Sequence, residues 1–153
     1  MKMKVKMFVL AVLLLAAAAL GACSAQQADW SIAVAGAEKT EFTSADYAKL
    51  NAVTIEATLK TKGGTEKTQK YEGVLLSDVL EYLGAGEYAG VTVEAPDGYA
   101  KDYTPDIAGD PLTILAIKAD GQPLGDAGPV ESVAGGQMGN MWIMNVSKIT
   151  VNK

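Results

Sequence analysis

One side chain in this sequence could act as a nucleophile, as a soft metal ligand or as a point of covalent attachment. It is Cys23, the single cysteine among 153 residues, which ends the stretch "LGAC". A thiol reacts as a thiolate, which a neighbouring cation or base stabilises, and the sequence contains no histidine. A leftover cysteine in an exported protein needs a specific explanation. The residues before Cys23 therefore indicate which of these three roles the thiol has.

The segment that precedes Cys23 has the pattern of an export signal. Lys2, Lys4 and Lys6 are followed by an apolar run from Met7 to Leu20. That run is short for a bilayer of about 30 Å, which takes roughly 20 apolar residues to cross as a helix. We therefore predict that residues 1–22 are a signal peptide that is removed after export.

The residues next to Cys23 indicate how the exported protein is held. Leu20, Gly21 and Ala22 resemble the lipobox of bacterial lipoproteins, which implies cleavage before Cys23 and acylation of its sulfur. Two acyl chains are enough for stable anchoring. We expect a protein anchored through Cys23 to the outer face of the cytoplasmic membrane, or to another envelope membrane, with residues 23–29 as a lipidated tether. The alternative is an ordinary secretory cleavage site beside a cysteine.

The charge of the remaining chain excludes one class of partner. All thirteen basic residues are lysines, and removal of the three in the signal leaves ten against eighteen carboxylates, a net charge near −8. An acidic protein is repelled by phosphate backbones. We therefore expect no nucleic acid partner. The absence of arginine also removes the side chain that binds oxyanions with two parallel hydrogen bonds.

The stretch "GGQMGNMWIMN" contains our candidates for ligand binding, namely Gly135, Gly136, Met138 and Trp142. Its glycine amides could cradle an anion, although the spacing matches no phosphate-binding loop, and a flexible connection is the simpler use of these residues. Three methionines spaced by three could hold Cu(I). If the segment is a strand, however, alternation places Met141 opposite the other two, and we favour the simpler interpretation that these side chains fill the core.

Other constellations give no catalytic or metal site. Six aspartates in the second half could collect Ca²⁺, but they lack EF-hand spacing and suit turns on a solvated surface. No histidine base is present, and no serine or threonine has an evident activating partner. We predict no catalytic residue and no metal ligand.

The pattern of apolar residues predicts an α+β domain over residues 30–153, with a compact mixed or antiparallel sheet and two short helices. We expect helices at "FTSADYAKLN", with Thr43 or Ser44 as N-cap, and at "GVLLSDVLEYLG", where Gly84 follows the end. A hairpin should turn at residues 62–65. Further strands are expected at residues 30–36, 89–95, 99–104, 112–120 and 141–151, with turns at 96–98, 105–111 and 120–121.

The order of these elements resembles the molybdopterin-binding domain of sulfite oxidase-like oxidoreductases. The matching stretches are "FTSADYAKL", "YEGVLLSDVLEYLG", "VTVEAPDGYAKDY", "LAIKADGQPLGDAGPV" and "MWIMNVSKITV". The resemblance implies a compact mixed domain that in the full enzymes holds a molybdenum cofactor, which oxidises or reduces small oxyanions or sulfoxides.

Two departures from that family set the expected function. The family's molybdenum ligand is a cysteine before the Gly-Val-x-Leu helix, whereas "LKTKGGTEKTQKYEG" has none. Where the family uses cations to bind the cofactor's phosphate and anionic substrates, this chain has Glu131 and Met141. We therefore expect no molybdenum cofactor, and a module that binds a ligand or an envelope redox or binding-protein partner. The alternative is a molybdopterin-dependent oxidoreductase, or its accessory subunit, completed by another chain.

Overall fold

The computed structural model describes residues 29–153. The predicted signal peptide, the lipidation site Cys23 and residues 24–28 of the tether lie outside the described residues, so these assignments stay predictions. Within residues 29–153, none of the helices has the length and apolar character needed to span a membrane.

The described chain forms ten strands and five short helical segments. The strands are β1 (Ser31–Ala35), β2 (Glu41–Thr43), β3 (Val53–Lys60), β4 (Glu66–Leu75), β5 (Gly90–Glu94), β6 (Ala100–Tyr103), β7 (Thr113–Ala119), β8 (Gln122–Pro123), β9 (Glu131–Ala134) and β10 (Lys148–Asn152). The α-helices are α1 (Ser44–Tyr47), α2 (Leu76–Tyr82) and α3 (Pro105–Ala108), and the 3-10 turns are η1 (Gly125–Ala127) and η2 (Gly139–Met141).

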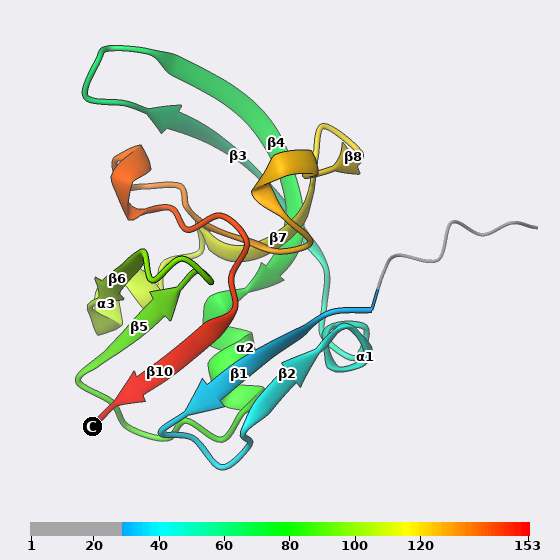
Figure 1. The fold of residues 1–153 in the computed structure, drawn as a ribbon, viewed down its shortest axis with the longest axis vertical. Helices are drawn as coiled ribbons and strands as arrows, with labels where there is room; N and C mark the ends of the chain where they lie inside the picture. Colours follow the sequence, from blue (N-terminus) through cyan, green and yellow to red (C-terminus); the bar gives the residue numbers. More distant parts are fainter. Residues whose placement is uncertain (1–28) are drawn as a thin grey trace, which may run out of the picture.

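Two five-stranded sheets organise the fold (Figure 1). The first has the order β2-β1-β10-β5-β6 and is mixed, because β1 and β10 run parallel while its other pairs are antiparallel. The second has the order β3-β4-β7-β8, with β9 also paired to β7, and is antiparallel throughout. The predicted α+β class with a mixed sheet is confirmed.

Helix α2 packs on β4 and β7 and closes the core. Leu76, Val79, Leu80 and Leu83 are at most 2% exposed, as their spacing of three and four residues predicts for one face of a helix. The helix ends at Tyr82 with Leu83 as its C-cap, and Gly84 follows as expected, with a φ of +72°. The amide of Ala85 donates to the carbonyl of Leu80, which completes a Schellman motif.

The hairpin of β3 and β4 is the element that shapes the site. Its turn closes where the sequence predicts, with the Thr61 amide donating to the Thr65 carbonyl and Gly64 at a φ of +81°. Ile55 and Ala57 are buried and Glu56 is exposed, as expected where successive side chains of a strand point to opposite faces and one face packs on the core. The outer end of the β3–β4 hairpin extends past the other strands of the second sheet and curves over the rest of the domain (Figure 1).

The expectation of two helices was wrong, because a third short helix, α3, occupies part of the predicted turn at residues 105–111. Thr104 accepts a hydrogen bond from the Ile107 amide, Pro105 stands in the first turn and Gly109 forms the C-cap. These residues satisfy the rules for beginning and ending a helix. The predicted helix at residues 42–51 is also shorter than expected, although Thr43 is its N-cap.

The expected strand at residues 141–151 was wrong in its first half. Met141 belongs to η2, and regular pairing begins only at Lys148. The reason is that this segment leaves one sheet for the other: Ile143 forms a bridge to Ser132 in β9, then Asn145 adopts a φ of +52°, and β10 joins the first sheet. Strands β2, β8 and β9 were not predicted.

Candidate ligand-binding cavity

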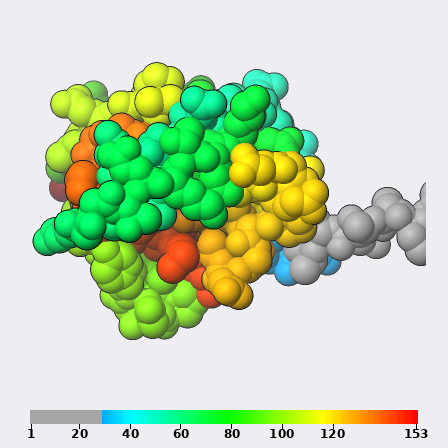
Figure 2. Space-filling model, turned by 90° about the horizontal axis from the view of Figure 1, so that it is seen from above, coloured from blue at the N-terminus to red at the C-terminus, as the bar shows by residue number. Residues whose placement is uncertain are grey.

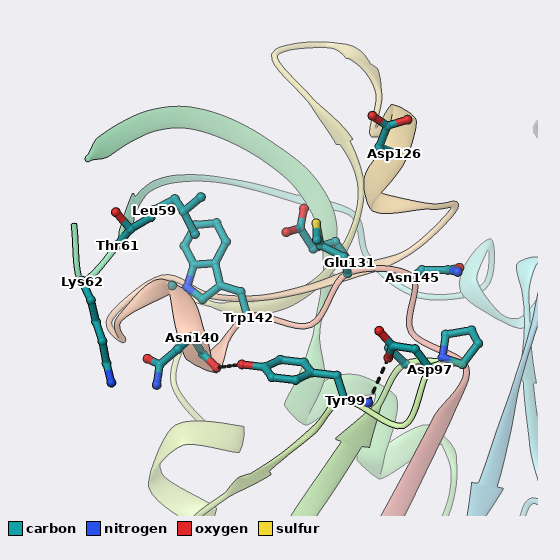
Figure 3. Close-up of a pocket in the computed structure, with 14 residues that line it drawn as sticks. Leu59, Thr61, Lys62, Asp97, Tyr99, Asp126, Glu131, Asn140, Trp142 and Asn145 are labelled. Carbon is teal, nitrogen blue, oxygen red and sulfur yellow. Dashed lines mark hydrogen bonds between the residues drawn. The ribbon is translucent and has the colours of Figure 1, made fainter. Parts of the chain in front are cut away.

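A cavity of about 690 Å³ lies beneath the β3–β4 hairpin. Its walls come from the end of β3 and the following turn, from the turn between β5 and β6, and from the segment between η2 and β10 (Figure 3). Seen from above, the hairpin and the β5–β6 turn flank a hollow with orange-red atoms of the chain before β10 between them (Figure 2). The volume is within the range of small-molecule sites.

Trp142 forms the rigid apolar wall. It is 4% exposed, and its indole Nε1 donates to the buried carbonyl oxygen of Ala134 at 2.8 Å. The ring of Tyr71 meets it edge to face, with 5.5 Å between the ring centroids. Because the indole's one donor is already used, the part of the ring that borders the cavity offers only apolar and π contacts.

The mouth of the cavity is held by Tyr99. Its hydroxyl donates to the carbonyl oxygen of Asn140 at 2.6 Å, and its amide donates to Oδ1 of Asp97 at 2.9 Å. These bonds fasten the β5–β6 turn to η2. Both turns are therefore held in place at the entrance.

The charges around the cavity are mostly negative. Asp97, Asp126 and Glu131 line it, and among the described lining residues Lys62 is the one cation. In Figure 3 the side chain of Lys62 extends away from Glu131, on the far side of Trp142. The interior of the cavity is thus open to a positive group and unfavourable for an anion.

Glu131 is the unusual residue of this site. It begins β9, is 8% exposed, and among residues 29–153 its carboxylate accepts no hydrogen bond and forms no ion pair within 4.0 Å. Burial raises the pKa of Glu131 from 4.5 to about 7, although the positive charge of Lys67 opposes this rise. The same side chain also borders a second cavity of about 460 Å³, shared with Lys67 and Tyr71.

Comparison with known families decides what kind of domain this is. The model of the oxidoreductase molybdopterin binding domain matches residues 20–153. The chain belongs to this family. The recognition made from the sequence motifs is therefore confirmed for the domain.

Among solved structures, this molybdopterin-binding domain is similar to the sulfane dehydrogenase SoxCD from Paracoccus pantotrophus, with a TM-score of 0.73 and 22% identity. The match covers 80% of this chain and 38% of that chain, so the domain spans well under half of the SoxCD chain. At this identity the likeness shows the fold. A search of curated protein sequences finds no match.

The side chains present do not fit the family's cofactor. The β3–β4 hairpin, where the family resemblance calls for a thiolate, has no cysteine, and the whole chain has neither arginine nor histidine. Three carboxylates line the cavity, and they would repel the anionic phosphate of a pterin cofactor. The sulfur of Met144 also borders it, but a thioether is a weaker donor than a thiolate for tethering the metal.

The structure divides the predicted ligand-binding residues between two places. Trp142 lines the cavity beneath the hairpin, whereas Gly135, Gly136 and Met138 line a separate one of about 460 Å³. The four residues are close in sequence, but the chain turns at η2 between Met138 and Trp142, so they do not line one cavity. That any of the four binds a ligand stays a prediction.

The methionines differ from the expected core role. Met138 and Met144 are 44% and 58% exposed, and only Met141 is partly buried against the core. The strand alternation invoked for them does not apply, because η2 occupies residues 139–141. Met138 and Met144 line different cavities, an arrangement that does not favour a shared copper site.

Three of the six aspartates serve turns, whereas Asp102 lies in β6, Asp106 in α3 and Asp126 in η1. Asp97 and Asp110 accept hydrogen bonds from the amides of the second residue after each, and Asp120 accepts from the amide of Lys70. Over residues 29–153, no cluster of three or more Asp, Glu, His or Cys side chains is placed to hold a metal ion.

Sequence reasoning missed several lining residues. Glu131 stood out only as a charge reversal relative to the family, and its burial was not foreseen because β9 was not predicted. Leu59 and Tyr99 gave no signal of their own, since the curvature of the hairpin and the geometry of the β5–β6 turn bring them to the cavity.

Proposed function

We propose that this protein is a lipid-anchored, extracytoplasmic binding module that uses the molybdopterin-domain fold without a molybdenum cofactor. The observation that supports it best is the lining of the cavity. An apolar wall at Trp142 and a buried carboxylate at Glu131 make a formed site for a small ligand, while the chain lacks the thiolate and the guanidinium groups that the family's cofactor would need.

The anchoring part of the proposal rests on Cys23 and the residues before it. The full chain should be expressed in a bacterial host fed with labelled palmitate. We expect the label in the protein and the protein in the membrane fraction, with both lost in Cys23→Ala. Ser24→Ala leaves the thiol in place and serves as the matched control. Incorporation of label into Cys23→Ala would contradict lipidation at this residue.

The cofactor-free part of the proposal is tested by elemental analysis. The full chain, extracted from membranes in detergent, should contain no molybdenum by plasma mass spectrometry and release no pterin fluorescence after denaturation. One equivalent of molybdenum that survives gel filtration would overturn it.

The family match by itself favours a second candidate, in which the chain is a molybdopterin-dependent oxidoreductase or an accessory subunit of an envelope electron-transfer system. Another chain would then supply the missing ligands. Affinity purification from the native envelope distinguishes the two functions, because this candidate requires a co-purifying redox protein together with molybdenum. Co-purification of an envelope binding protein without molybdenum would support the binding module.

A further inference from the structure

We propose that the cavity beneath the β3–β4 hairpin binds a small organic amine in its protonated form, with the ammonium group on the carboxylate of Glu131 and the apolar body against Trp142. This inference rests on the proposed binding function and names the chemical class of its ligand.

The first argument is the state of Glu131. Glu131 as a residue is only 8% exposed, and what exposure it has includes its carboxylate oxygens, since no fully buried side-chain oxygen in residues 29–153 lacks a hydrogen-bond partner. A carboxylate with so little contact with water is stabilised by a paired or hydrogen-bonded group. In the described part of the chain it has neither kind of partner, and Figure 3 shows its oxygens directed into the space beside the indole of Trp142. An ammonium N–H donor placed there would supply both the missing hydrogen bond and the missing counter-charge.

The protein's own cations do not fill this role. Lys67, on β4, borders the second cavity and acts on Glu131 only at long range, and Lys62 points away from it. The burial-driven rise of the Glu131 pKa to about 7 agrees with a carboxyl group that has no close cation. The site therefore favours a positively charged group, which the described residues do not place next to Glu131.

The remaining walls suit an amine with an apolar body. Trp142 presents π surface, and Leu59 and Met144 add aliphatic and thioether surface. A cation near an indole face is attracted by the ring quadrupole. Asp97 and Asp126 at the rim add negative potential along the approach. An amino group attached to a ring or a short alkyl chain would place its charge at the acidic side chains and its apolar part against the apolar walls.

Other ligand classes fit less well. A carboxylate or phosphate ligand would face three acidic side chains. A divalent metal ion needs several oxygen ligands in one place, and no such cluster of acidic side chains is formed in residues 29–153. A neutral apolar ligand would leave Glu131 buried and without a partner.

The experiment is isothermal titration calorimetry of the full chain in detergent, at mildly alkaline pH and low salt, with phenethylamine as the probe. Phenylacetate, similar in size but opposite in charge, is the ligand control. We expect phenethylamine to bind and phenylacetate not to bind. Glu131→Gln, which keeps the shape and removes the charge, should weaken phenethylamine binding roughly tenfold or more, as loss of a charged hydrogen bond predicts.

The control variant is Glu81→Gln, which removes one exposed carboxylate on α2, away from the cavity. It should bind phenethylamine as the wild type does. Equal affinity of wild type and Glu131→Gln, equal binding of both probes, or no heat with phenethylamine up to millimolar concentration would each overturn the inference. Thermal unfolding of each variant checks that the binding loss is not a folding loss.

Molybdenum content is measured on the same samples. A protein that contains no molybdenum and does not bind phenethylamine contradicts only the proposed class of ligand. A protein that carries molybdenum contradicts the proposed function itself.

Discussion

Tyr71 on β4 meets Trp142 edge to face, with the two rings 85° apart in plane and 5.5 Å apart between centroids. This contact joins the hairpin to the segment that precedes β10, two parts of the chain that are separated in sequence by strands β5 to β9. Since Trp142 also donates to the Ala134 carbonyl, two strands of the second sheet, β4 and β9, and the crossing segment are held at one ring. The wall of the cavity is therefore also part of the core.

Removal of the indole should destabilise the domain. Trp142→Ala is expected to lower the free energy of unfolding by about 3–5 kcal/mol, through lost burial and the cavity left behind. Trp142→Phe retains most of the ring contact but loses the hydrogen bond to Ala134, and should cost about 1–2 kcal/mol. Urea unfolding followed by circular dichroism measures both. A smaller loss for Trp142→Ala than for Trp142→Phe would contradict this account of the wall.

Glu131 should make the domain less stable as pH rises. Its pKa is about 7 in the folded protein against an ordinary 4.5, so between these values the folded state holds more protons than the unfolded state. Stability then falls with rising pH across that window and levels off above it. The ionised carboxylate costs about 2–4 kcal/mol at the plateau, since one pKa unit is worth about 1.4 kcal/mol.

Glu131→Gln isolates this effect. The variant should be more stable than the wild type above neutral pH and should show a flatter stability profile from mildly acidic to neutral pH. Tyr71 and Tyr103, whose pKa values are both affected by the charge of Glu131, have pKa values raised to about 12 and stay neutral in this window. The Glu81→Gln control, which changes an exposed carboxylate, should follow the wild-type profile. A variant profile as steep as that of the wild type would assign the titration to another group.

The local part of the fold could be predicted because short-range patterns determine it. The spacing of Leu76, Val79, Leu80 and Leu83 specifies the buried face of α2, and Gly64 marks the hairpin turn. Asp120 and Gly121 also form the predicted turn, with φ of 50° and 76°, which matches a type I′ hairpin. These features depend on neighbours within a few residues.

The candidate site could be predicted only in part because long-range pairing builds it. Glu131 is buried since β9 lies against β7, pairing it with Ala116, and nothing within a few residues of Glu131 requires that strand. The crossing of residues 141–147 between the sheets likewise depends on the bridge between Ile143 and Ser132, which no pattern in either segment indicates. Trp142 was singled out because it stands beside three methionines in a glycine-rich stretch, a local feature that the sequence shows directly.

The N-cap of α1 supplies a prediction for acidic pH. The hydroxyl of Tyr82 donates to Oδ1 of Asp46 at 2.6 Å, and with Lys49 and Thr43 it holds the pKa of Asp46 well below its ordinary 3.8. Such a group stabilises the fold fully above its ordinary pKa, and the contribution is lost as pH falls toward the folded-state pKa.

Tyr82→Phe removes that donor and keeps the ring contact with Phe42. We expect a loss of about 1–2 kcal/mol at neutral pH, shrinking as the pH falls below 3.8. Urea titrations at neutral and acidic pH measure the difference. Tyr88→Phe, which removes a hydroxyl with no side-chain hydrogen bond in the described residues, is the matched control. A loss that is the same at both pH values would show that the hydroxyl does not act through Asp46.

Gly139 should be essential for the close approach of the hairpin to η2. A Cβ at this position would lie 2.6 Å from Cδ1 of Leu59 and 3.0 Å from the carbonyl oxygen of Lys60, closer than packed carbon atoms tolerate. Gly139→Ala therefore forces the end of β3 outward and should cost about 1–3 kcal/mol. Gly63→Ala, at a position with its nearest neighbouring atom 3.8 Å away, should have little effect.

The source of the Gly139 clash can be separated by a double-mutant cycle. Leu59→Ala removes the clashing methyl group, so Gly139→Ala should cost clearly less in that background than in the wild type. Because both residues line the cavity, the single variant should also weaken phenethylamine binding and the double variant should recover part of it. Strict additivity of the two stability changes would mean that the Lys60 carbonyl, rather than the Leu59 side chain, limits how closely the hairpin packs.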